Sequence, residues 1–92
     1  MRELFDAYVK NALGHWNKHG GEFPEYQNAK QYVEGAQDFI DNPPPGTLTQ
    51  VRPNGDNLLY NPNTNTFASA TSNGVPKTMF RPWNGINYWN GL

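Results

Sequence analysis

The sequence has no cysteine, no long apolar run and little net charge. Without cysteine, neither a disulfide framework nor a thiolate metal site can form, so packing must stabilise the fold. The apolar runs are far shorter than the roughly 18 residues that a membrane span requires, and no basic-then-apolar signal region opens the chain. A net charge of −1 also lacks the basic excess of a dedicated nucleic-acid-binding domain.

A chain of 92 residues with 36% apolar residues has room for one core, so we expect a single domain over 1–92. Residues 1–42 carry four basic and seven acidic side chains, a net charge of −3, whereas 43–92 carry three basic and one acidic, a net charge of +2. A local cationic face is therefore possible on a weakly acidic protein.

Two helices are predicted in the first part, 1–42. Apolar residues at steps of three and four predict a helix over about 2–19, with a buried stripe of Phe5, Val9, Ala12 and Trp16. A second helix begins after Asn28, a good N-cap, and must end before the prolines at 43–45. Its apolar face consists of Ala29, Tyr32, Val33, Ala36, Phe39 and Ile40.

Four strands are predicted at 47–52, 57–60, 66–71 and 75–80, because turn-forming residues separate short β-prone runs. Asn54-Gly55 predicts a two-residue hairpin loop, in which Val51 faces Leu58 and Arg52 faces Asn57. The fold class is therefore α+β: two N-terminal helices pack on one face of a four-stranded antiparallel sheet, formed within 47–82. The other face is left free for function, and the aromatic tail, 83–92, shows no period and is expected to wrap over the sheet edge.

His15, Lys18 and His19 lie at helical steps of three and four, which places them on one helix face. Two imidazoles beside an ammonium can take a proton from a ribose 2′-hydroxyl, protonate a leaving oxygen and stabilise the phosphorane charge without a metal. Two alternatives stay open. Cations near a helix C-terminus also interact favourably with the helix dipole. Two histidines four residues apart can also bind zinc, although no further zinc ligands lie at a suitable spacing.

Polar residues on or beside the predicted strands would serve a site on the sheet face. They are Arg52, Asp56, Tyr60, Lys77, Thr78 and Arg81. Each has a structural alternative, such as capping the turn for Asp56 or joining the core for Tyr60. Trp83, Tyr88 and Trp89 can stack on bases, but a tryptophan-rich tail also serves as a lid on a small core.

Several ordered blocks of the sequence resemble one known family. They are HWNKHG (15–20), EF (22–23), AKQY (29–32), PPGTL (44–48), RPNGD (52–56), YNP (60–62), Phe67 and TMFRP (78–82). The chain resembles the C-terminal nuclease domains of CdiA-type contact-dependent inhibition proteins and other polymorphic bacterial toxins. This resemblance implies the fold of the barnase, EndoU, colicin and RelE group and cleavage of RNA, often tRNA, with no cofactor.

The resemblance also implies roles for individual residues. His15 and His19 become the acid and base, Lys18 and Arg52 become phosphate ligands, and Thr78 lies near the scissile phosphate. Tyr60 and Arg81 would assist, and Lys77, Arg81, Trp83, Tyr88 and Trp89 would bind substrate. We therefore expect a monomeric, metal-independent endoribonuclease toxin that yields a 2′,3′-cyclic phosphate.

The same resemblance implies a biological setting. Such a domain is delivered within a larger effector, acts in the target-cell cytoplasm, has no membrane anchor of its own and is neutralised by a cognate immunity protein. The alternative is a non-catalytic module that binds RNA or protein through the sheet face and the tail aromatics. A DNA nuclease is disfavoured, because Asp56 is the only acidic residue in 43–92.

Overall fold

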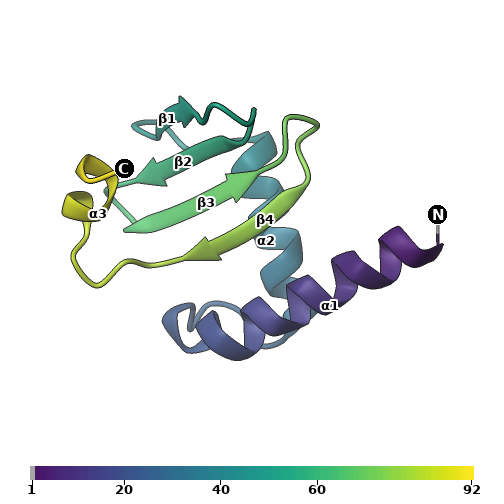
Figure 1. Ribbon diagram of the computed structural model, residues 1–92. Helices are drawn as coiled ribbons and strands as arrows, with labels where there is room; N and C mark the ends of the chain where they lie inside the picture. The colour runs from purple at the N-terminus through teal and green to yellow at the C-terminus, as the bar shows by residue number, and fades with distance from the viewer. Residues whose placement is uncertain (1) are drawn as a thin grey trace.

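A twisted four-stranded antiparallel sheet lies at the centre of the computed structural model, with helices arranged around it (Figure 1). The structure describes residues 2–92, with side chains described from residue 10 onward. The strands follow one another in the order β1-β2-β3-β4, as predicted. The elements are α1 (Arg2–His19), the 3-10 helix η1 (Gly20–Glu22), α2 (Ala29–Asp41), β1 (Leu48–Val51), β2 (Asn57–Asn61), β3 (Thr66–Ala70), β4 (Pro76–Phe80) and α3 (Ile86–Asn90).

Helix α2 lies behind the sheet in Figure 1 and supplies the main core. Its N-cap is Asn28, whose side chain accepts a hydrogen bond from the Gln31 backbone at 2.9 Å, as the sequence predicted. Buried residues of α2 pack against the sheet. This core cluster contains Phe23, Tyr32, Ala36, Ala68 and Met79. The hydroxyl of Tyr32 also donates to the carbonyl of Met79, which joins α2 to the edge strand β4.

The α+β class is confirmed, but the prediction of only two helices was incomplete because α3 follows the sheet. Its five residues are too few to show a helical period, so the tail 83–92 gave no signal. Tyr88 and Trp89 of α3 pack against a second cluster, Leu58, Tyr60 and Phe67, with Phe80 beside it. One end of the sheet face opposite α2 is therefore covered, and that face is only partly open.

The hairpin between β1 and β2 has a different register from the predicted one. Val51 pairs with Asn57 and Gln50 with Leu58, and the Arg52 backbone N–H donates to the Asp56 carbonyl at 2.9 Å. The loop thus contains three residues, and only Gly55 has a positive φ, of 92°. A three-residue loop needs one left-handed residue, which Gly55 supplies, whereas the expected two-residue loop would require two.

Helix α1 runs along the outer side of β4, the edge strand next to it (Figure 1). Trp16 packs against the main core, with its ring centroid 5.7 Å from that of Tyr32. The predicted stripe residues Phe5 and Val9 lie outside the described side chains. Among the described residues, 2–92, no helix is long and apolar enough to cross a membrane.

Two helical glycines have opposite surroundings, and this gives a test of the packing. A Cβ at Gly35 of α2 would collide with the Tyr26 ring, which is itself packed on Phe23, whereas a Cβ at Gly14 of α1 would meet no atom of the described residues within 4 Å. We expect Gly35→Ala to lower the free energy of unfolding by roughly 1–3 kcal/mol and Gly14→Ala to raise it by about 1 kcal/mol. Urea denaturation measures both, and shifts in the same direction would contradict this packing.

Candidate active site

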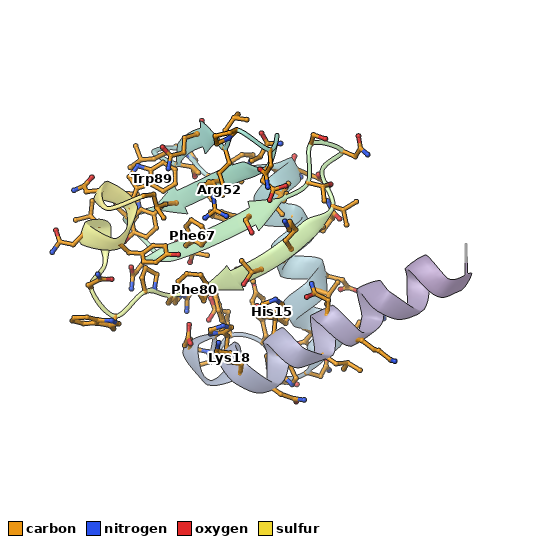
Figure 2. All side chains as sticks on the ribbon, in the orientation of Figure 1. His15, Lys18, Arg52, Phe67, Phe80 and Trp89 are labelled. Carbon is orange, nitrogen blue, oxygen red and sulfur yellow. The ribbon has the colours of Figure 1, made fainter. Side chains whose placement is uncertain are left out.

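The C-terminal part of α1 places both histidines against β4. His15 points from α1 toward the strand (Figure 2), and its Nδ1 lies 3.3 Å from Thr78 Oγ1. The His15 and His19 rings are stacked, with centroids 5.9 Å apart and planes inclined by 16°. The His19 ring lies in turn 5.5 Å from that of Phe80. The four-residue spacing of the histidines therefore stacks their rings, with His15 beside the hydroxyl of Thr78.

His19 is held by a carboxylate that the sequence analysis did not single out. Glu22 Oε2 lies 2.8 Å from His19 Nδ1, and Glu22 Oε1 accepts the backbone N–H of Arg81 at 2.7 Å. Glu22 therefore orients the ring relative to the end of β4, and Nε2 is the ring nitrogen that it does not contact. A carboxylate on Nδ1 is a common way to orient a catalytic imidazole. The only sequence signal for it was the three-residue step from His19.

Burial lowers the pKa of His15 below its ordinary value of 6.5, and the nearby charges of His19 and Lys18 lower it further. Each of these effects disfavours the imidazolium form. His15 is accordingly mostly neutral at pH 7 and can accept a proton. Lys18 itself is exposed, one helical turn from His15 on the same side of α1.

The sheet face opposite α2 carries a row of side chains across the strands, of which Ser69 and Leu58 are buried. The register aligns Thr78 with Ser69, Ser69 with Leu58, and Leu58 with Gln50. Alternation along a strand places residues that pair in this way on one face. Ser69, which the sequence analysis did not name, is therefore a hydroxyl on the same face as Thr78.

Beyond this row, the face carries two cations of the second half of the chain. Lys77 Nζ contacts Asp56 Oδ2 at 2.6 Å, and this contact is the main reason why the pKa of the Asp56 carboxyl is lowered. Arg52 lies on the same face as Phe67 (Figure 2) and is exposed. It lies two residues beyond Gln50 of β1, three strand spacings from β4, so its backbone is roughly 14 Å or more from that of Thr78. Arg52 shares the face of the histidines but does not lie beside them.

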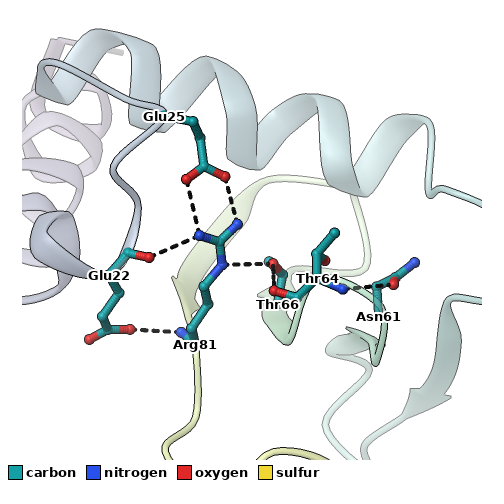
Figure 3. A network of polar contacts seen from close by, with 6 residues as sticks. All are labelled: Glu22, Glu25, Asn61, Thr64, Thr66 and Arg81. Atoms are coloured by element: carbon teal, nitrogen blue, oxygen red, sulfur yellow. Dashed lines mark hydrogen bonds and ion pairs between the residues drawn. The ribbon is translucent and has the colours of Figure 1, made fainter.

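Arg81 is engaged elsewhere. Its guanidinium makes two hydrogen bonds to Glu25, of 3.0 and 2.6 Å, and one to the Glu22 carbonyl of 2.9 Å (Figure 3). It also contacts Thr66 and lies 4.4 Å from the Phe23 ring centroid. These partners pack on the α2 side of the sheet. Arg81 therefore connects the segment after α1 to the sheet and does not reach the histidines from the other face.

Tyr60 also lies apart from the histidines. Its side chain is buried, its hydroxyl donates to Asn65 at 2.7 Å, and its ring stacks on Trp89 with centroids 6.2 Å apart. Burial raises the pKa of the Tyr60 hydroxyl. Of the three tail aromatics, Tyr88 and Trp89 form the lid on this cluster, whereas Trp83 is 95% exposed.

Comparison of the chain with protein-family models and with curated protein sequences finds no match. His15, His19, Lys18 and Thr78 come together with Glu22 at the junction of α1 and β4. Arg52 and Lys77 lie farther along the same face, and Tyr60 and Arg81 serve the packing.

The lowered pKa of His15 can be measured by NMR titration of the imidazole resonances. We expect its pKa to lie below 6.5 and to rise in Lys18→Ala, because that substitution removes a positive charge that disfavours the imidazolium. Lys30→Ala is the control, since Lys30 is exposed on α2 and pairs with Glu34, and it should leave the His15 pKa unchanged. A His15 pKa above 6.5 would contradict the described environment.

Proposed function

We propose that this chain is an endoribonuclease that cleaves RNA by attack of a ribose 2′-hydroxyl on the adjacent phosphate. The observation that carries the proposal is the stacked His15–His19 pair, in which one ring contacts Thr78 and the other contacts Glu22. A centroid separation of 5.9 Å lets both imidazoles reach one phosphodiester group.

In this reaction His15, neutral at pH 7, accepts the proton of the 2′-hydroxyl as the 2′-oxygen forms its bond to phosphorus. The bond from phosphorus to the 5′-oxygen breaks, and His19 donates a proton to that leaving oxygen. Lys18 stabilises the negative charge on the phosphorane oxygens. The products are a 2′,3′-cyclic phosphate and a 5′-hydroxyl, and the step requires no metal ion.

Thr78 and Glu22 set the positions of the two rings in this proposal. The Thr78 hydroxyl holds His15 at Nδ1, so Nε2 faces the substrate, and Glu22 does the same for His19. Lys77 and Arg52 lie farther along the open face, where they would contact phosphates beyond the scissile one. The site thus combines acid–base groups with a phosphate-binding surface.

We propose that this activity serves interbacterial competition, with tRNA as the substrate and an immunity protein as the inhibitor. The support is the ordered resemblance of blocks over roughly 15–89 to contact-dependent inhibition toxins of the barnase, EndoU, colicin and RelE group. A module that only binds is the second candidate, favoured by the exposure of Trp83. The two candidates differ in whether the histidines are required.

Alanine substitutions of the histidines test the chemistry. We expect His15→Ala and His19→Ala each to lower kcat on tRNA by roughly 100-fold or more, because each removes a proton-transfer group. Cleavage is followed in chelator by gel, the product ends are mapped, and circular dichroism confirms folding. Lys30→Ala should retain full activity. Cleavage that is undiminished in both histidine variants would refute the proposed roles of His15 and His19.

Glu22 is a positioning residue in this proposal, and Glu25 provides a matched control. We expect Glu22→Gln to lower kcat on the order of 10-fold or more with little change in KM, because the carboxylate that orients His19 is lost. Glu25→Gln weakens the pairing with Arg81 and should lower the unfolding free energy without this loss of kcat. Equal kcat values for the two variants, both measured well below their unfolding temperatures, would rule out a positioning role.

A further inference from the structure

Trp83 is the most exposed large apolar side chain among the described residues, at 95%, and the next is Val51 at 67%. The indole is a large apolar group that small domains normally bury, and Tyr88 and Trp89 of the same tail are packed. Tryptophan is one of the residue types enriched among side chains that contribute most to binding. The exposure of Trp83 therefore indicates a binding site.

The backbone on either side of Trp83 is fixed. Pro82 is buried, and its carbonyl accepts hydrogen bonds from Asn65 Nδ2 at 2.9 Å and from the Gly85 N–H at 3.1 Å. Asn65 is held in turn by the Tyr60 hydroxyl. The indole thus extends from a turn whose backbone is held by hydrogen bonds, so little conformational entropy is lost from this loop when a ligand binds.

The turn begins at the end of the strand that carries the site. Trp83 follows Phe80 by three residues, so their Cα atoms are at most about 10 Å apart. The Phe80 ring lies 5.5 Å from that of His19. The backbone of Trp83 therefore lies close to the strand end whose side chain contacts His19.

The chemistry of this segment fits a nucleobase better than a protein. Residues 77–92 contain no acidic residue, so no carboxylate of this segment repels a polyanion. Asn87, on α3 just after the turn, is exposed, and an amide side chain can pair with a base edge. A base within an A-form duplex does not present its face to a side chain, whereas an unpaired base does.

We propose that Trp83 stacks on an unpaired nucleobase next to the cleaved phosphodiester, so that the substrate is a single-stranded or looped segment of RNA. This inference rests on the proposed ribonuclease activity, which it makes more specific. It predicts that affinity for a single strand depends on Trp83, and that affinity for a duplex does not.

The test is the binding of a fluorescently labelled 2′-O-methyl RNA single strand, which the enzyme cannot cleave, measured by anisotropy. We expect Trp83→Ala to weaken binding roughly 5- to 100-fold, and Trp83→Phe to retain most of the affinity. Val51→Ala removes an exposed apolar side chain on the distant strand β1 and should bind as the wild type does. A duplex of the same sequence should bind equally to all four proteins.

Equal affinities of the wild type and Trp83→Ala for the single strand would overturn the inference and leave the indole to a protein contact. A loss of duplex binding in Trp83→Ala equal to its loss of single-strand binding would also overturn the inference. Cleavage of unmodified RNA by the wild type is measured in parallel. Binding that depends on Trp83 without any cleavage would support the base site and refute the ribonuclease, whereas cleavage with binding independent of Trp83 would refute only the base site.

Discussion

The contact between the end of α1 and strand β4 is the constraint on which the candidate site depends. The carboxylate of Glu22 forms this contact. One of its oxygens binds the His19 ring, and the other accepts the backbone N–H of Arg81. Thr78 adds a second link to His15. Without these contacts, a helix packed beside an edge strand could slide or rotate, and the two imidazoles would lose their common orientation.

The cations of the chain divide between packing and the open face. Arg81 pairs with Glu25 on the α2 side, and Lys77 pairs with Asp56 across the open face. Two of the three basic side chains of 43–92 thus have acidic partners, and the +2 charge of this part does not translate directly into a cationic surface. Local attraction for phosphate depends more on Lys18 and Arg52, which are exposed.

Much of the fold follows from local patterns. The cap at Asn28, the prolines after α2 and the turn residues between strands act over a few residues, so the prediction gave α1, α2 and the four strands in the right order but lacked α3. The hairpin register was wrong, because Asn-Gly is compatible with both two- and three-residue loops, and the paired strands decide between them. Helix α3 was missed because packing on the aromatic cluster, not its own sequence period, stabilises it.

Helical spacing alone places His15, Lys18 and His19 on one helix face, because such spacing is a local property. The partners of that face come from tertiary packing: Thr78 lies 63 residues from His15, and Arg81 lies 59 residues from Glu22. Tertiary packing also separated residues with similar local signals, since it buried Tyr88 and Trp89, exposed Trp83 and turned Arg81 to the opposite face. Contacts across such separations depend on how the layers pack, which no local pattern contains.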